Sequence, residues 1–403
     1  MSQNLSDFIS AIAYKKLSAV ETDRRVSNQH EFNGVTKLKN ILGTPKKPYY
    51  FPARVIYFSD LDDDLTAADT TLSWYDSRKG VSTRAAEYRL YYQKNPVTDL
   101  MSKGDFFVFL KTKLGEYAVI ISKAGSTSEN QIKLLFNIPG EIKERANLRI
   151  LSDDRKQRLD FVRATILESI GIQPDITDPS YLDTILKTFN GKWPDTKSFS
   201  LFSRKTLSDL DPIGKPDETL IKCYEQETIL FKTLEKHFTG TKVSEGFVDV
   251  EDFISYSLTV QNRRKSRSGH ALENHLEYLF QENEIKYSCR EITERKSRPD
   301  FIFPGIKEYH DKSFNESLLV MLGVKTTCKE RWRQILPEAD RIDTKHLCTL
   351  EPAISKDQTD EMKSKKVILV IPEPIRFTYQ LDQQHDVLNV ARFIELIHGK
   401  QNR

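Results

Sequence analysis

Cysteine is scarce in this sequence, which has four cysteines among its 403 residues: Cys223, Cys289, Cys328 and Cys348. No two of them form a C-x-x-C pair, and no histidine stands beside them at the spacing of a zinc finger. This pattern argues against a disulfide scaffold and against a structural zinc site. We therefore expect free thiols in a protein of a reducing compartment.

Long apolar runs are also missing. No stretch approaches the roughly 18 consecutive apolar residues that cross a bilayer. The first residues, MSQNLSDFIS, lack the basic start and apolar centre of a secretory signal. Internal repeats are absent as well, which excludes a solenoid architecture. The expectation is a soluble cytoplasmic protein with no membrane partner.

The sequence also lacks a large excess of positive or negative charge. It has 61 basic and 58 acidic residues, for a net charge of +3. A nucleic-acid partner is neither shown nor excluded by this balance, because the position of the charges decides. With a length of 403 residues, two or three domains are expected.

The first part of the chain has the pattern of strands and turns. Residues 48–59 are rich in aromatic and β-branched residues, residues 87–92 alternate imperfectly between polar and apolar, and residues 105–112 and 116–122 flank a short turn at Gly115. We predict a twisted sheet or barrel, followed by helices over residues 155–170 and 181–189. This first domain is placed at residues 1–185, and the proline- and serine-containing residues 186–216 are interpreted as a linker.

The remaining residues, 217–403, alternate between helical and strand patterns and predict an α/β domain. Apolar residues at helical spacing indicate one helix over residues 270–282. Further helical structure is expected over 332–341, bent or restarted at Pro337, and over 387–398. Short strands are expected at 301–303, 346–350 and 367–371. The continuous apolar run 318–324 is typical of a central strand that is covered on both faces.

Four polar residues of this second domain fit the needs of metal-assisted phosphodiester cleavage. A hard divalent cation requires converging carboxylates, and a nearby lysine can orient water or stabilise the phosphate. Asp300 opens a strand, Lys325 follows the apolar strand directly, and Glu338 lies in the predicted helix beyond it. Glu273 belongs to the helix over 270–282. Each of these residues alone is more often an ordinary surface residue.

Longer motifs make the pattern specific. Residues 262–269 (NRRKSRSG), 272–280 (LENHLEYLF), 298–304 (RPDFIFP), 309–311 (YHD) and 324–340 (VKTTCKERWRQILPEAD) resemble the catalytic domain of the EcoRII-type restriction endonucleases. The resemblance implies a PD-(D/E)xK, restriction-endonuclease-like fold. It also implies that Mg²⁺ binds to two carboxylates. The catalytic residues that it implies, by position, are Asp300 and Glu338 as metal ligands, Lys325 as the catalytic lysine, Glu273 as an additional acid, and Tyr309.

Charged residues near these motifs are candidates for DNA contact. Arginine and lysine pair with guanine edges in the major groove, and glutamate accepts a hydrogen bond from cytosine. The segment Lys329, Glu330 and Arg331 matches the part of the family motif that reads C·G pairs. Arg263 and Arg264 belong to a run of four cations in six residues, NRRKSR, for which phosphate contact is expected.

The N-terminal half resembles the same family more faintly. Residues 74–90 (WYDSRKGVSTRAAEYRL) and the strand pair at 106–122 are similar to its effector domain, a B3-like pseudobarrel that binds DNA without cutting it. The alternative is an ordinary charged strand edge that resists aggregation. The candidate DNA contacts are Arg78, Lys79, Arg84, Glu87 and Arg89.

These patterns predict a two-domain, magnesium-dependent type II restriction endonuclease that cuts double-stranded DNA at CCWGG-like sites. A companion DNA methyltransferase is implied as a partner. Two alternatives stay open: a repair nuclease of the same fold, and a sequence-specific DNA-binding regulator whose nuclease half is inert. A dimer is common among enzymes that cut palindromes, but the sequence shows no readable dimer surface.

Overall fold

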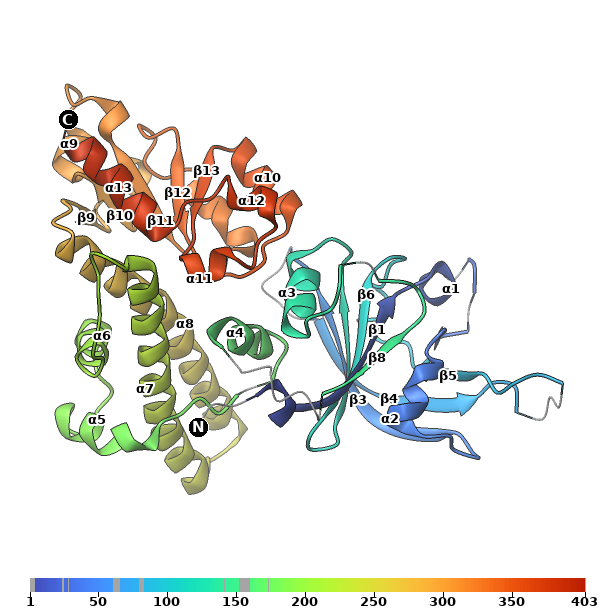
Figure 1. The fold of residues 1–403 in the computed structure, drawn as a ribbon. Coiled ribbons are helices and arrows are strands. Elements are labelled where there is room, and N and C mark those ends of the chain that lie inside the picture. Colours follow the sequence, from blue (N-terminus) through green and yellow to red (C-terminus); the bar gives the residue numbers. More distant parts are fainter. Residues whose placement is uncertain are drawn as a thin grey trace. The chain divides into compact units, whose positions relative to one another are not determined.

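The computed structural model describes residues 4–23, 25–27, 29–60, 66–79, 83–140, 142–151, 160–172 and 174–402. The chain divides into two compact units, whose elements are labelled in Figure 1. Unit 1 is Met1–Pro174 with Ala353–Ser355, and unit 2 is Asp175–Pro352 with Lys356–Arg403. Among the described residues, no helix is long and apolar enough to cross a membrane.

Unit 1 is built on a curled sheet of eight strands in the order β2-β5-β4-β3-β7-β6-β1-β8 (Figure 1). Neighbouring strands are antiparallel except β3 and β7, which run parallel. The mainly β character predicted for this half is thus confirmed. The strands are β1 (Ile9–Lys16), β2 (Glu31–Phe32), β3 (Tyr49–Phe58), β4 (Thr66–Asp76), β5 (Tyr88–Tyr92), β6 (Phe106–Thr112), β7 (Tyr117–Ser122) and β8 (Asn147–Ile150).

The predicted hairpin around Gly115 is formed by β6 and β7, which pair from Phe106–Ser122 to Lys111–Tyr117. Gly115 has a φ of 88°, which glycine adopts without strain. Side chains of β6 alternate between two apolar cores: Phe107 and Phe109 enter one, and Phe106 and Val108 enter the other. Burial on both faces explains why this strand is a continuous apolar run rather than an alternating one.

Helices cover the sheet of unit 1. Residues of α3 (Thr127–Leu135) and α4 (Phe161–Ser169) pack into the core that contains Phe106. The expected helix over 155–170 is therefore found from Phe161, and its predicted start at 155–159 lies outside the described residues. Short turns of helix complete the unit: η1 (Leu5–Asp7), α1 (Ala19–Thr22), η2 (Thr36–Leu38) and α2 (Lys39–Leu42).

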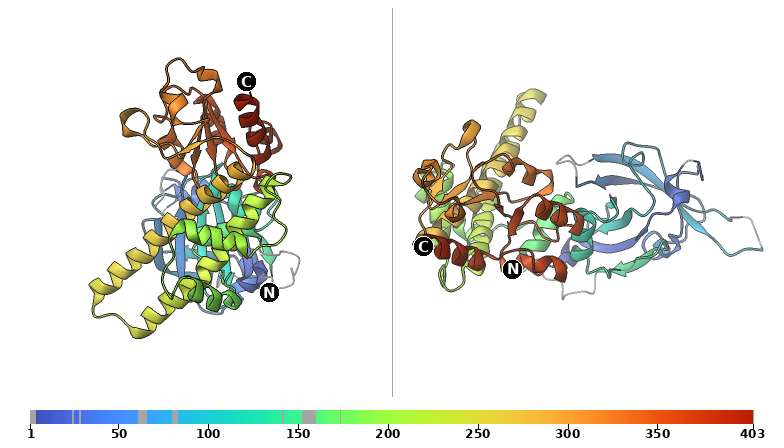
Figure 2. Two further views of the ribbon diagram at one scale, coloured as in Figure 1. Left: turned by 90° about the vertical axis from the view of Figure 1, so that its left-hand side faces the viewer. Right: turned by 90° about the horizontal axis from the view of Figure 1, so that it is seen from above.

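Unit 2 begins with a helical layer. A hairpin of two long helices, α7 (Pro216–Glu245) and α8 (Val250–Glu282), dominates it. Figure 2 shows the turn between them far from the sheet of the same unit. The predicted helix over 270–282 is only the last third of α8. Two shorter helices, α5 (Leu182–Thr188, after η3, Pro179–Tyr181) and α6 (Thr196–Lys205), pack against the hairpin.

Residues 186–216, which we expected to be a linker, do not behave as one. They contain the end of α5 and all of α6, and the unit boundary lies earlier, after Pro174. The carboxylate of Asp195 caps α6 by accepting from the Ser198 N–H at 2.9 Å. Phe199 of α6 is buried against Phe231 of α7. Aromatic packing thus holds this segment on the helical layer.

The α/β character predicted for residues 217–403 is confirmed by a five-stranded sheet in the order β13-β12-β11-β10-β9. Its strands are β9 (Ser288–Cys289), β10 (Phe301–Phe303), β11 (Val320–Val324), β12 (Lys345–Cys348) and β13 (Val367–Val370). β11 lies at the centre, as its apolar run predicted. The remaining elements are η4 (Glu294–Lys296), α9 (Ile306–His310), η5 (Glu316–Leu318), η6 (Lys329–Ile335), α10 (Lys356–Ser364), α11 (Glu373–Arg376), α12 (Leu381–Gln384) and α13 (Val390–Gln401).

The helical structure expected over 332–341 is present only as far as Ile335; the expected break near Pro337 is found, but the helix does not restart after it. The 3-10 helix η6 ends at Ile335, and a turn follows in which Ala339 has a φ of 50°. Pro337 has no N–H to donate to a continuing helix. Glu338 therefore lies in a bend and not, as predicted, on a helix.

Candidate active site

Asp300 and Lys325 come together where two inner strands of the unit 2 sheet begin and end. Asp300 immediately precedes β10 and Lys325 immediately follows β11. The two strands are antiparallel, with Phe301 opposite Leu322, so the start of one lies beside the end of the other. Lys325 Nζ is 3.3 Å from Asp300 Oδ2, which also accepts from the Val324 N–H at 2.7 Å. Asp300 and Lys325, which were predicted to flank two strands, thus lie side by side.

Backbone pairing fixes the lysine further. The Lys325 N–H donates to the Cys348 carbonyl of β12 at 3.0 Å. Both charged side chains of the pair are mostly buried, with exposed fractions of 17% for Lys325 and 13% for Asp300. A charge pair that is shielded from water interacts more strongly than an exposed one. The Asp300–Lys325 pair is therefore a charge pair that the sheet shields from water.

The carboxyl group of Glu338 interacts electrostatically with both members of this pair. Burial and the negative charge of Asp300 raise the pKa of Glu338 to about 7, against the opposing effect of Lys325 and Lys345. Its Oε2 is buried and, among the described residues, has no hydrogen-bond partner. A buried carboxylate oxygen without a donor is costly for a folded protein. Such an oxygen is open to a cation.

Gly323 allows Glu338 to reach this position. It lies in the central strand β11, and a Cβ added there would come within 2.7 Å of Ile335 Cγ2. Only a glycine lets the end of η6 lie this close to the strand. The bend that carries Glu338 follows Ile335 by three residues. Close packing between η6 and β11 thus places Glu338 over the sheet edge.

Glu273 approaches from α8. It is buried, and its pKa is raised by burial and by the charge of Asp300. Arg290 Nη2 lies 2.6 Å from Glu273 Oε2 and 2.8 Å from His270 Nδ1. Neither Arg290 nor His270 belongs to the set predicted from the sequence. Arg290 stands in a turn with a φ of 53° and is brought to Glu273 by the pairing of β9 with β10.

The carboxylate of Asp300 is close enough to shift the pKa of Glu273 and of Glu338, but the three do not form a ready-made metal-binding cluster. Over the described part of the chain, no group of three or more His, Cys, Asp or Glu side chains could hold a metal ion. Asp300 raises the pKa of both Glu273 and Glu338. That excess of negative charge, together with the unpaired oxygen of Glu338, fits a hard divalent cation held through oxygen ligands.

The raised pKa of Glu338 predicts a specific pH dependence. A carboxyl with a folded-state pKa near 7 and a lower unfolded-state value binds more protons when folded, so its effect destabilises the protein as pH rises through that window. Without metal, wild-type protein should therefore lose stability relative to Glu338→Gln between pH 5 and pH 8. Melting temperatures of both proteins in a chelator check this. An unchanged difference between them would contradict it.

Tyr309, predicted as a catalytic residue, uses its hydroxyl group within the protein. Its side chain is fully buried, and its hydroxyl donates to both carboxylate oxygens of Glu294 at 2.6 Å. The same hydroxyl accepts from the Arg341 N–H at 3.4 Å. Through these hydrogen bonds, Tyr309 joins α9 to η4 and to the turn after Glu338. Burial and the Glu294 hydrogen bond raise the pKa of Tyr309. The buried Tyr309 side chain therefore helps to hold these three segments together.

The candidate base-reading residues lie at the start of η6. Glu330 pairs with Arg333, which in turn holds both carboxylate oxygens of Glu361 at 2.7 and 2.8 Å. Lys329 has a φ of 28°, and its carbonyl accepts from Gln358 Nε2 at 2.7 Å. The Arg331 side chain is half-buried and has no ion-pair partner among the described residues. The segment is therefore preorganised, with one guanidinium available.

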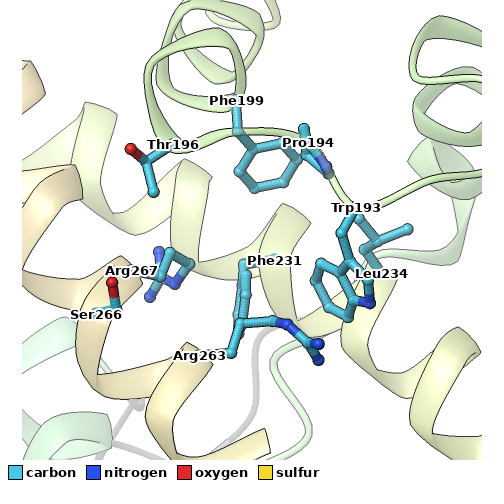
Figure 3. A pocket seen from close by; sticks show the side chains of 9 residues that line it. All are labelled: Trp193, Pro194, Thr196, Phe199, Phe231, Leu234, Arg263, Ser266 and Arg267. Carbon is cyan, nitrogen blue, oxygen red and sulfur yellow. The ribbon is translucent and has the colours of Figure 1, made fainter. Parts of the chain in front are cut away.

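Arg263 and Arg264 lie on α8, facing α7 and the loop before α6. Arg264 is bound to Glu235 of α7, with Nη2 2.6 Å from Oε2. Arg263 stacks on the Trp193 ring at 4.3 Å and lines a pocket of about 130 Å³ with Phe199, Phe231 and Arg267 (Figure 3). Contacts within the protein thus already engage both cations that we expected at DNA phosphates.

The candidate contacts of unit 1 gather around β5. Arg78 Nη2 lies 2.7 Å from Glu87 Oε2, and Arg89 lies 2.6 Å from Glu31 and 3.7 Å from Glu87. Lys79 Nζ donates to the Lys46 carbonyl at 2.6 Å. Arg84 is exposed, and no ion pair of Arg84 occurs among the described residues. Four of the five predicted residues are therefore held in local networks.

Part of unit 2 is similar to known proteins. Residues 231–394 match the family described as EcoRII C terminal. The matched span contains Glu273, Asp300, Lys325 and Glu338. The type II restriction enzyme EcoRII of Escherichia coli is 40% identical over 185 residues, covering 46% of this chain and 46% of that enzyme. The resemblance to the EcoRII family that the motifs predicted is confirmed.

Other matches are weaker. The type II restriction enzyme SsoII of Shigella sonnei is 24% identical, covering 39% of this chain and 60% of SsoII. This chain thus spans about half the length of the curated relatives that it matches. Among solved structures, metal-depleted Ecl18kI in complex with uncleaved DNA has a TM-score of 0.45 at 20% identity, covering 56% of this chain and 85% of that chain. The PspGI–substrate DNA complex has a TM-score of 0.43 at 16% identity, covering 52% and 93%.

Proposed function

We propose that this chain is a type II restriction endonuclease that makes magnesium-dependent double-strand cuts in DNA at CCWGG-like sites. One observation carries the proposal: Lys325 pairs with Asp300, and Asp300 raises the pKa of Glu273 and of Glu338, all within the span that matches the EcoRII C-terminal family. The proposal includes a cytoplasmic setting and a companion methyltransferase that protects host DNA. The PD-(D/E)xK fold of unit 2 is part of it.

Each residue has a distinct task in this proposal. Asp300 and Glu338 would hold Mg²⁺, which when bound neutralises phosphate charge and acidifies water. Lys325, kept beside Asp300 at 3.3 Å, places a positive charge where the scissile phosphate would develop negative charge. Glu273 supplies a further acid, and Arg290 keeps it oriented at 2.6 Å. We assign Tyr309 to the support of this centre and not to the chemistry.

The direct test is digestion of plasmid DNA with and without Mg²⁺, followed by run-off sequencing of the cut ends. We expect ends at one short sequence and no cutting in a chelator. Cutting at mismatched or branched DNA without sequence preference would favour the repair nuclease. Specific binding without any cutting would favour the inert regulator. Both outcomes reject the proposal.

Base reading predicts a second measurable effect. Arg331→Ala should reduce discrimination between the cognate site and a site with one altered C·G pair, by about 1–3 kcal/mol for the lost base contact. Glu330→Ala should act in the same direction, because Arg333 holds Glu330 in place. Competition binding with cognate and altered duplexes measures this. Arg295→Ala, an exposed arginine outside the segment, is the control.

An equal loss of affinity for all duplexes would give the opposite answer. It would make Arg331 a phosphate contact, because phosphates carry no sequence information. The salt dependence of binding distinguishes the two roles, since each lost phosphate contact lowers its slope by about one.

For unit 1, we propose a B3-like effector domain that binds specific DNA without cutting. The observation that supports this is the ordered group around β5, in which Arg78, Glu87 and Arg89 form a chain of ion pairs. Such a chain holds guanidinium groups in fixed orientations, which suits bidentate contacts to base edges. Arg84, which is exposed, adds a further positive charge beside them.

A further inference from the structure

The helical layer of unit 2 contains a pocket of about 130 Å³ between the segment before α6 and the α7–α8 hairpin (Figure 3). None of the four proposed catalytic residues lines this pocket. Its walls combine apolar side chains with two positive charges. Small-molecule sites have this composition, because a few polar groups orient a ligand inside an apolar hollow. The walls are formed chiefly by Trp193, Phe199, Phe231, Leu234, Arg263 and Arg267.

Arg267 carries a buried charge that the protein compensates only in part. Its exposed fraction is 9%, and its Nε and Nη1 have no hydrogen-bond acceptor among the described residues. The acid within ion-pair distance is Glu227, whose Oε1 lies 3.6 Å from Nη1, beyond the length of a hydrogen bond. A buried charge is costly to the fold unless it is paired and hydrogen-bonded. An anion in the pocket would therefore stabilise the guanidinium of Arg267.

The carboxylate of Glu227 is shared between Arg267 and two other groups. Glu227 is fully buried, and its Oε2 lies 2.9 Å from His275 Nε2. Arg204 Nη1 lies 3.2 Å from His275 Nδ1. A guanidinium only donates hydrogen bonds, so Nδ1 accepts, and the neutral ring of His275 carries its proton on Nε2, facing Glu227. The charge of Glu227 also acts on Arg204. Part of the attraction of Arg267 for an anion is thus left unused.

The apolar walls determine what else a ligand of the pocket must carry. The ring of Trp193 lies 5.5 Å from the ring of Phe231, and the guanidinium of Arg263 stacks on it at 4.3 Å. Phe199 and Phe231 are both buried (Figure 3). An apolar cavity of about 150 Å³ accommodates a benzene ring, so a volume of about 130 Å³ suits a single aromatic ring. A small inorganic anion would leave these walls without an apolar partner.

We propose that this pocket binds a small aromatic carboxylate, with its ring among Trp193, Phe199 and Phe231 and its carboxylate beside Arg267. Binding of this ligand does not depend on DNA cleavage. One consequence rests on the proposed function. Arg267 precedes Glu273 by six residues on α8, which is fewer than two helical turns. A bound ligand would therefore fix the part of the helix that leads to the candidate active site.

Calorimetric titration of the full-length chain without DNA tests the proposal, with benzoate as the probe. Benzoate should bind with a dissociation constant of about 1 mM or lower. Benzamide keeps the ring and loses the charge, whereas acetate keeps the charge and loses the ring. Each of these two compounds should bind at least about tenfold more weakly than benzoate, which corresponds to about 1.4 kcal/mol. The reason is that each of them contacts only one of the two features of the pocket.

Variants of the pocket locate the two interactions. Arg267→Met keeps most of the side chain's length without its charge, so it should weaken benzoate binding at least about tenfold and leave benzamide binding unchanged. Lys265→Met removes an exposed charge outside the pocket and should leave benzoate binding unchanged. Thr196→Phe fills the pocket from its half-buried rim without changing a charge and should abolish binding of both compounds. This variant decides the test if Arg267→Met does not fold, which circular dichroism checks.

Fluorescence shows where the ligand lies. The chain has three tryptophans, of which Trp74 and Trp332 are fully buried and do not line the pocket. Benzoate should therefore change the emission of Trp193. In Trp193→Phe, which keeps an aromatic wall, the change in emission should disappear, while calorimetry should still detect binding.

Four results would overturn the proposal. The first is the absence of saturable benzoate binding. The second is equal binding of benzamide, which would make the pocket a purely apolar site, and the third is equal binding of acetate, which would leave a surface that attracts any anion. The fourth is benzoate binding that neither Arg267→Met nor Thr196→Phe weakens, because the ligand would then lie elsewhere. None of these results depends on whether the protein cuts DNA, so failure here is distinct from failure of the endonuclease assignment.

Discussion

Lys325→Ala is expected to lower the cleavage rate by at least about a thousandfold, within the range lost when a proton-transfer or charge-stabilising group is removed. Asp300→Ala should have an effect of the same size, because it removes both a proposed metal ligand and the partner that holds Lys325 at 3.3 Å. Binding of the specific duplex in the presence of Ca²⁺ should persist in both variants. The reason is that both residues act on the reacting phosphate and not on base edges.

Single-turnover cleavage of a short duplex gives the rate, and fluorescence anisotropy gives the affinity. Lys312→Ala removes an exposed lysine from the turn after α9 and is the matched control for loss of charge. It should cut at the wild-type rate. Cleavage by Lys325→Ala within about tenfold of wild type would remove Lys325 from the catalytic set, since a tenfold change is only about 1.4 kcal/mol of barrier.

Asp300→Ala and Lys325→Ala should also differ in their effect on the stability of the protein. The Val324 N–H donates to Asp300 Oδ2 at 2.7 Å, so Asp300→Ala leaves a backbone donor of the central strand without its partner. A loss of stability is therefore expected for Asp300→Ala and not for Lys325→Ala. Asp300→Asn retains an oxygen at this position and should restore stability without restoring cleavage. Thermal melting of the three variants distinguishes structural from chemical loss.

Asp300 and Lys325 were predicted from the family motif, and their strand ends explain why they are neighbours. Asp300 opens β10 and Lys325 ends β11, and antiparallel pairing makes these positions neighbours. No periodicity signals Arg290, which depends on a positive-φ turn and on the pairing of β9 with β10. His270 was hidden by lying one turn before Glu273 on a helix whose full length was not predicted.

Motif matching located Tyr309 but could not supply its partner. The partner, Glu294, comes from a short 3-10 turn that has no strong sequence signal. A similar failure concerns α6, where prolines and serines favoured a linker, although Asp195 and Ser198 have the spacing of a helix cap. In both cases tertiary packing, through Phe199 for α6, decides what the local pattern leaves open.

Separating the chain after Pro174 should separate the two proposed activities completely. Fragment 175–403 contains Glu273, Asp300, Lys325 and Glu338, so it should cut DNA when Mg²⁺ is present. Fragment 1–174 contains none of them and should bind one specific duplex without cutting it. Unit 1 has two apolar cores of its own, which supports folding of the shorter fragment.

The full chain should then respond to the number of sites on a plasmid. If a second site occupies unit 1, it either raises the local concentration of DNA at unit 2 or relieves a block, and both effects make a two-site plasmid the faster substrate. Arg84→Ala removes an exposed cation from the proposed effector surface and should reduce this advantage. Fragment 175–403 should cut one-site and two-site plasmids at equal rates, because it has no second binding surface.

Two measurements test the role proposed for unit 1 most directly: DNA binding by fragment 1–174, and the rates at which the full chain cuts the two plasmids. A specific gel shift by fragment 1–174, weakened by Arg84→Ala and not by Lys113→Ala on the β6–β7 turn, would assign DNA reading to the group around β5. Equal rates of the full chain on both plasmids, together with no specific shift by the fragment, would reject the effector role. The charged residues would then protect the part of β5 that the two-residue edge strand β2 leaves unpaired, because charge at an exposed edge prevents pairing with other chains.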